Sequence, residues 1–263
     1  MNNMTNDKGP ANGRRAAMKI IRTLEEFRNP ENVAGMARFG INSKNTLGVS
    51  ISMIRDLAKE IRGDEELKSN IHTLALELWD TEVHEARILA GFIDDPEQVT
   101  EEQIEKWVSG FDSWDVCDQV CSGLFDRTKF AAKKAEEWTK RKEEFVKRAG
   151  FVLMAALAAH DKGAGDKKFL NFIPIIKRES TDERNFVRKA VNWALRGIGK
   201  RNLRLNKAAI KAGREIQGIN SRSAKWIASD ALRELTSPAV LKRLSKIKSK
   251  KPMGKKLRQT GVR

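Results

Sequence analysis

Apolar residues recur every three or four positions along most of the chain, from about residue 15 to residue 246. This spacing places them on one face of an α-helix. A representative stripe in segment 187–198 comprises Val187, Ala190, Val191, Ala194 and Ile198. No segment shows the alternation of apolar and polar residues that is typical of a half-buried strand. The pattern therefore predicts an all-α protein.

Helix-breaking residues divide this pattern into short segments. The breaks stand at Asn29-Pro30, Gly63-Asp64, Asp94-Asp95-Pro96, Lys162-Gly163-Ala164-Gly165, Ser180-Thr181-Asp182 and Ser237-Pro238. Residues 100–103 have the composition of a capping box, and Pro238 suits the first turn of a helix. Thr181 or Asp182 suits the cap of the helix that follows. The breaks predict helices of roughly 10 to 20 residues joined by tight turns.

Short helices in succession are typical of helical pairs stacked side by side. Because the chain has no strict repeat, a solenoid of degenerate repeats and an irregular helical bundle both fit the pattern. We expect a single helical domain at 15–244, a disordered N-terminus at 1–14 and a basic, disordered tail at 245–263. Residues 1–14 lack the apolar core of a signal peptide, and no stretch approaches about 18 uninterrupted apolar residues. We therefore expect a cytoplasmic protein without a membrane partner.

The net charge of +16 is unevenly distributed. Residues 1–130 contain 16 Lys and Arg against 23 Asp and Glu, whereas residues 131–263 contain 35 against 12. Such a concentration of positive charge repels itself unless a polyanion is nearby. Nucleic acid is therefore the first partner to consider, and an anionic membrane the second. Because no helix shows the bulky apolar face that membrane insertion needs, the sequence favours nucleic acid.

One carboxylate stands on an apolar helix face. In FDSWDVCDQVCSGLF the apolar stripe comprises Phe111, Trp114, Cys117, Cys121, Leu124 and Phe125. Asp118 lies inside this stripe, four residues after Trp114, whereas Asp112 and Asp115 lie off it. A carboxylate on a packing face costs free energy unless it is paired, capped or used in a cleft. A hydrogen bond to a neighbouring turn is the simpler interpretation of Asp118, and a catalytic role is the alternative.

One arginine stands in apolar surroundings. Arg148 is flanked by Phe145, Phe151 and Val152, and either an ion pair, for example with Asp118, or a fork to a phosphate would explain it.

Trp193 lies off the stripe of its own helix, in a row with Lys189, Arg196 and Lys200. Burial against a neighbouring element and stacking on nucleic acid both fit this indole.

The sequence offers little for a metal or a cofactor. His84-Glu85 lacks the second histidine of a zinc helix, and the glycines of KGAGDK lack the spacing of a phosphate-binding loop. Cys117 and Cys121 are read as reduced, buried thiols. We expect neither metal nor cofactor.

Five segments in chain order carry a resemblance to a known family. They are LGVSISMIRDLAKEI, LALELWDTEVHEARILA, WVSGFDSWDVCD, FVKRAGFVLMAAL and FVRKAVNWALR. Together they resemble the AlkD-like family of DNA alkylation repair glycosylases, whose members are built from HEAT-like helical repeats. The resemblance implies a curved α-solenoid whose concave basic face holds duplex DNA. It also implies a monomer that removes N3- or N7-alkylated purines without a metal or cofactor, in the cytoplasm near the nucleoid.

The resemblance assigns roles to individual positions. Asp118 is similar to the catalytic aspartate, which would stabilise the oxocarbenium-like sugar and position water. Trp114 and Trp193 match the two tryptophans, and Arg148 matches the arginine beside them. Arg196 matches an arginine that contacts the DNA backbone, and its neighbours Lys189 and Lys200 are predicted to bind DNA as well.

Two other functions remain open at this point. Asn185-Phe186 stands where one member of the family has paired aromatic residues just before the second tryptophan. Some relatives keep the fold without excising bases, so a non-catalytic repeat protein that binds duplex or structured DNA is the alternative. A helical scaffold for protein partners is the third hypothesis, although it requires neither the basic half nor Trp193.

Overall fold

The computed structural model describes residues 10–249, and within that range the chain is helical and contains no strand. The helices are α1 (Pro10–Glu26), α2 (Pro30–Arg38), α3 (Ile51–Gly63), α4 (Glu65–Lys68), α5 (Ile71–Asp80), α6 (His84–Ile93), α7 (Glu101–Ser109), α8 (Trp114–Gly123), α9 (Ala131–Trp138), α10 (Glu144–His160), α11 (Asp166–Arg178), α12 (Asn185–Gly199), α13 (Leu203–Gln217), α14 (Arg222–Leu235) and α15 (Pro238–Ser249). Short 3₁₀ turns occupy Phe125–Arg127 and Glu179–Thr181. The prediction of an all-α protein is confirmed for this part of the chain.

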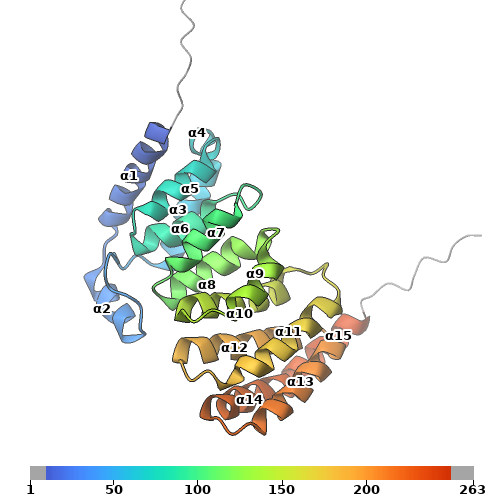
Figure 1. The fold of residues 1–263 in the computed structure, drawn as a ribbon. Coiled ribbons are helices and arrows are strands. Elements are labelled where there is room, and N and C mark those ends of the chain that lie inside the picture. The colour runs from blue at the N-terminus through green and yellow to red at the C-terminus, as the bar shows by residue number, and fades with distance from the viewer. Residues whose placement is uncertain (1–9, 250–263) are drawn as a thin grey trace, which may run out of the picture.

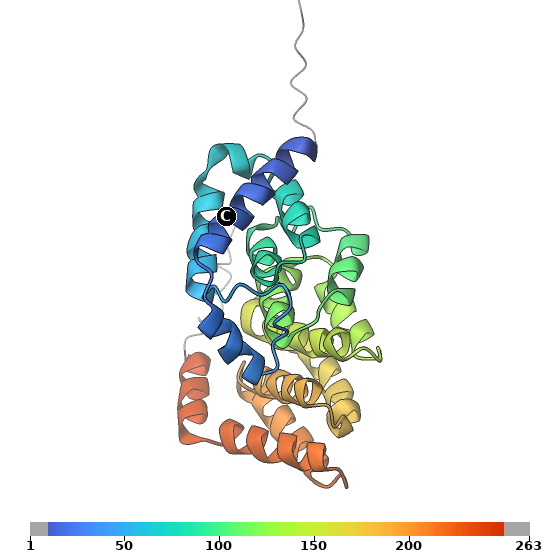
Figure 2. The same ribbon diagram turned by 90° about the vertical axis from the view of Figure 1, so that its left-hand side faces the viewer.

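Alternate helices form a continuous row through the molecule. Each of α3, α6, α8, α10, α12 and α14 packs against the next in this order. The intervening helices α5, α7, α9, α11 and α13 each pack against a member of this row (Figure 1). This is the stack of helical pairs expected of a solenoid rather than of an irregular bundle. Figure 2 shows α1 and the pair α13–α14 at opposite ends of the stack.

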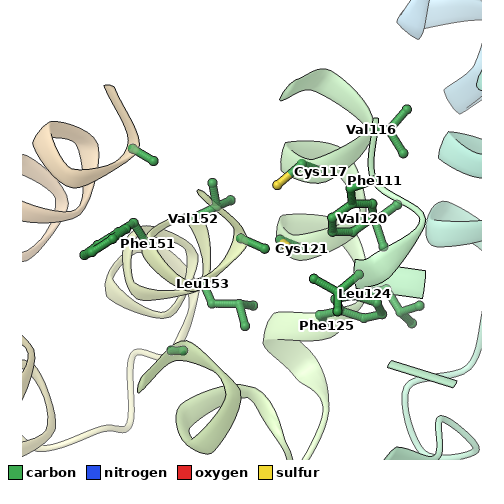
Figure 3. Packing of buried hydrophobic residues seen from close by; sticks show 14 of the residues in the cluster. Phe111, Val116, Cys117, Val120, Cys121, Leu124, Phe125, Phe151, Val152 and Leu153 are labelled. Atoms are coloured by element: carbon green, nitrogen blue, oxygen red, sulfur yellow. The ribbon is translucent and has the colours of Figure 1, made fainter. Parts of the chain in front are cut away.

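The core is continuous along the row and densest at its middle. Helix α10 buries every residue from Arg148 to Ala158, which is the pattern of a helix enclosed by neighbours on all sides. Cys117 and Cys121 are fully buried, and Figure 3 shows them on α8 at its contact with α10. Both cysteines are free thiols, as predicted. The middle of the stack is thus a rigid base for side chains on α8 and α10.

Most of the predicted breaks coincide with helix ends. Pro30 and Pro238 each open a helix, and Thr100 accepts the amide of Gln103 at the start of α7. The reciprocal half of this capping box does not form, because the Gln103 side chain donates to Asp94 instead.

The prediction that Thr181 or Asp182 caps the next helix is wrong. Helix α12 begins later, at Asn185, and has no side-chain cap. The Asp182 carboxylate is engaged by the guanidinium of Arg184 and the ammonium of Lys147. These ion pairs hold the carboxylate at the turn that precedes the helix.

The helical region extends beyond the predicted domain limits. Helix α1 begins at Pro10 instead of near residue 15, and α15 continues past residue 244 to Ser249. The remaining parts of the predicted tails, 1–9 and 250–263, lie outside the described residues. Among the described helices, none combines the length and the apolar character that crossing a membrane requires.

Candidate active site

Asp118 and Arg148 form a two-pronged ion pair between α8 and α10. The Nε and Nη2 groups of Arg148 donate to the two carboxylate oxygens of Asp118 over 2.9 and 2.8 Å. The Asp118 side chain is 13% exposed and that of Arg148 is 6% exposed. The ion pair that the sequence left as one interpretation of Arg148 is therefore present. The planar fork fixes the carboxylate in one orientation, and the Asp118 side chain stays partly exposed.

Burial governs the protonation of this carboxylate. Removal from water raises the pKa of Asp118 above its usual value, and the charge and hydrogen bonds of Arg148 offset this effect only in part. The neighbouring Asp115 carboxylate raises the Asp118 pKa further. A carboxylate that is shielded from water interacts more strongly with an approaching positive charge than an exposed one does, because the local dielectric constant is lower.

Arg148 also connects the pair to α12. Its Nη1 group donates to the carbonyl oxygen of Phe186 over 2.6 Å. The ring of Phe186 packs on Phe145, with ring centroids 5.6 Å apart. Asn185 and Phe186 thus open α12 beside the Asp118–Arg148 pair. One guanidinium holds three consecutive helices of the row together at this point.

Trp114 is held by the connection that follows α2. Its indole N–H donates to the carbonyl oxygen of Phe39 over 3.1 Å. The next residue, Gly40, has φ +77° and lies so close to the Phe186 ring that a Cβ there would be 2.6 Å from Cζ. Only glycine adopts this backbone conformation without strain and leaves room for the ring. The α2–α3 connection therefore contacts both α8 and α12 beside the Asp118–Arg148 pair.

The side chain of Glu85 binds the backbone of the α2–α3 connection. Its carboxylate, fully buried in α6, accepts the backbone amides of Leu47, Gly48 and Val49. Three amide donors satisfy this buried carboxylate. The sequence shows Glu85 only as half of an incomplete zinc motif, because the amides it binds lie about forty positions earlier.

His84 and Asp115 form a second buried cluster that the sequence did not reveal. The Nε2 atom of His84 is 2.8 Å from a carboxylate oxygen of Asp115, whose other oxygen accepts the hydroxyl of Ser113. Burial alone would lower the pKa of His84, but the hydrogen bond and charge of Asp115 raise it. Asp115 lies off the apolar stripe of α8, as expected, yet it is 7% exposed because α6 covers it.

The row of predicted DNA-binding residues on α12 is only partly free. Lys189 is exposed. In contrast, Arg196 pairs with Asp230 and Glu234 of α14, and Lys200 pairs with Glu234. Trp193 is half-buried against the core and lines a groove of about 1410 Å³, so it is neither enclosed nor fully exposed.

A further cation that contacts α8 comes from the acidic half of the chain. Arg55 on α3 donates to the side chain of Gln119, the residue after Asp118. The concentration of positive charge in the C-terminal half does not predict this contact. Within the described residues, no group of three or more His, Cys, Asp or Glu side chains is placed to hold a metal ion.

The fold and this site define an α-helical repeat protein with a buried carboxylate–guanidinium pair at the middle of its stack. The sequence matches the family of DNA alkylation repair enzymes over residues 20–235, and the chain belongs to this family. No curated protein matches the sequence.

A solved structure is similar in fold, with a TM-score of 0.66, and the match covers 82% of this chain and 94% of that one at 19% identity. That structure is described as a new family of proteins related to the HEAT-like repeat DNA glycosylases with affinity for branched DNA structures. The predicted HEAT-like repeat fold is confirmed, whereas its curvature and the concave basic face remain predictions.

Proposed function

We propose that this protein is a DNA glycosylase that hydrolyses the N-glycosidic bond of cationic N3- or N7-alkylated purines in duplex DNA. It acts as a monomer in the cytoplasm and needs neither metal nor cofactor. The observation that carries this proposal is Asp118, a carboxylate oriented by Arg148 on a face otherwise used for packing. Family membership supports it, because the matched segment includes both residues.

The chemistry requires little beyond this carboxylate. An N-alkylated purine already carries a positive charge, so the electrons of the C1′–N bond leave with the base and neutralise it. Positive charge then develops on the deoxyribose, where Asp118 stabilises it. Water adds to C1′, and its proton passes to the carboxylate, which leaves an abasic site. Trp114 and Trp193 present π faces that favour the cationic sugar.

The free energy by which Asp118 stabilises the cationic sugar follows from the charges of Asp118 and Arg148. A carboxylate about 4 Å from the sugar contributes roughly 4 kcal/mol at an effective dielectric of about 20. The guanidinium of Arg148, behind the carboxylate at about 8 Å from the sugar, cancels roughly half of that. The remaining stabilisation of roughly 2 kcal/mol corresponds to about a 30-fold acceleration. When Arg148 binds a DNA phosphate instead of Asp118, its opposing charge is removed and the acceleration rises toward about a thousandfold.

Release of 7-methylguanine and 3-methyladenine from methylated duplex DNA tests the proposal. Asp118→Asn is expected to slow release by at least about 30-fold while DNA binding persists. The matched control is Asp112→Asn, which removes the same charge from an exposed carboxylate just before α8. Equal rates for Asp118→Asn and wild type would contradict the proposal.

A non-catalytic protein that binds duplex or structured DNA is the second candidate. Two observations favour it: Arg148 already occupies both oxygens of Asp118, and a similar fold belongs to proteins with affinity for branched DNA. In that case the wild type binds DNA with a steep salt dependence but releases no base from any methylated substrate.

A further inference from the structure

A groove lies at the C-terminal ends of α10 and α12, next to Trp193. Its floor is made of small residues, among them Ala155, Ala158 and Gly197. Its rim comes from the 162–167 connection, from the first turn of α13 and from α15. Because Trp193 is part of the lining, the groove adjoins the surface of α12 that is proposed to contact DNA.

Positive charge dominates the lining of this groove. The cations are Lys162, Lys167, Lys200, Arg201, Arg204 and Arg243, and the single acid is Asp166. Arg201 is used internally, since its guanidinium donates to carbonyl oxygens at the end of α10 and covers the Phe169 ring. Lys162 and Lys167 are exposed and make no ion pair within residues 10–249. The groove therefore carries an uncompensated positive charge that suits a polyanion.

Helix α15 forms one wall of the groove. Arg243 donates to the carbonyl oxygen of Lys200 at the end of α12, over 2.8 Å. Leu244 is 1% exposed, and α15 packs on α13 and α14. These contacts fix the helix in place. The family match ends at residue 235, so α15 lies outside the matched region.

The dimensions suit a phosphodiester backbone. The seven residues from Trp193 to Lys200 rise about 10 Å along α12 at about 1.5 Å per residue. That length accommodates at most about three phosphates of one DNA strand, because successive phosphates are at least about 3.4 Å apart. Lys162 and Lys167 line the same groove as Trp193, so a strand that follows the groove past Trp193 meets their ammonium groups.

We propose that this groove binds the phosphate backbone of the DNA strand that passes Trp193, with α15 as its outer wall. The inference shares the ligand of the proposed function but requires no base excision. It assigns Lys162, Lys167 and Arg243 to DNA binding and extends the protein's contact with DNA beyond the matched region of the family.

Substitution of these three cations tests the inference. The variant Lys162→Gln/Lys167→Gln/Arg243→Gln is compared with Lys207→Gln/Lys211→Gln/Arg214→Gln, which removes the same charge from α13 residues that line a different pocket. Affinity for lesion-free duplex DNA is measured by fluorescence anisotropy across a salt series. One phosphate contact contributes about eightfold to affinity near 0.1 M salt, so the groove variant is expected to bind about tenfold or more weakly, with a shallower salt slope.

Release of methylated bases at saturating protein separates this inference from the proposed function. A groove variant that binds DNA as the α13 variant does would overturn the groove assignment, whatever the rate of release. Weakened binding together with a wild type that releases no base would support the groove and refute the glycosylase. A wild type that does not bind duplex DNA would refute both.

Discussion

Replacement of Arg148 by glutamine isolates the contribution of the ion pair. The guanidinium makes three hydrogen bonds, two to Asp118 and one to the Phe186 carbonyl. Glutamine is shorter and uncharged, so it leaves the Asp118 carboxylate without an opposite charge in a place where its side chain is 13% exposed. Loss of one member of a buried pair costs about 3–5 kcal/mol. Because Asp118 retains some contact with water, we expect about 2–3 kcal/mol at neutral pH.

The loss is expected to depend on pH in a defined direction. Burial already raises the pKa of Asp118, and Arg148 is the group that opposes this rise. Without Arg148 the pKa of Asp118 rises further in the folded protein, which then binds a proton more tightly than the unfolded chain does. The folded variant therefore loses stability as pH rises from the ordinary aspartate pKa to the raised one. The free energy of unfolding of the variant is expected to approach that of the wild type near pH 4.5 and to lie furthest below it near pH 7.5.

Urea unfolding of both proteins across this pH range measures the effect. The control is Arg141→Gln, which removes a guanidinium that also forks onto a carboxylate, that of Glu143, but at the surface. Only a small change of stability is expected for the control, because water screens an exposed pair. If Arg148→Gln and Arg141→Gln lower the free energy of unfolding equally, the reasoning about Asp118 is refuted. A loss of stability in Arg148→Gln that does not grow with pH would refute it as well.

Two further substitutions test the connection between α2 and α3. Glu85→Gln replaces one acceptor of three backbone amides by a donor, and we expect a loss of about 3 kcal/mol in urea unfolding together with slower base release; a loss below about 1 kcal/mol would show that the amides find other partners. Gly40→Ala places a Cβ at φ +77° against Phe186, and thermal unfolding should show a loss of about 1–2 kcal/mol. Gly35→Ala in α2, where a Cβ meets nothing within 4 Å, is the control, and equal melting temperatures for the two alanine variants would contradict the strain at Gly40.

The fold was largely predictable because helical periodicity is a local signal. Pro30 and Pro238 mark helix starts through their own geometry, and both predictions are confirmed. The cap predicted at Thr181 or Asp182 failed because α12 begins later, at Asn185, and the Asp182 carboxylate binds Arg184 and Lys147 instead. Lys147 comes from a different helix, and a local rule cannot anticipate a partner more than thirty positions away.

The candidate site was predictable only in part. Asp118 stood out because a carboxylate on an apolar stripe is unusual, and Arg148 stood out for the same reason. Whether they pair depends on how α8 and α10 are set against each other, which periodicity does not specify. The contacts of Glu85 and the exact surroundings of Trp114 depend on the α2–α3 connection, whose path no local pattern describes.

The position of the Asp118–Arg148 pair at the middle of the stack protects it from fraying. In a protein where each helix packs mainly on its neighbours, opening starts at the two ends and advances one pair at a time. Helices α8 and α10 are then the last to lose their hydrogen bonds, so their amides should exchange with solvent deuterium most slowly. Terminal helices such as α1 and α15 can open and close, or change in sequence, while the geometry of the pair is maintained.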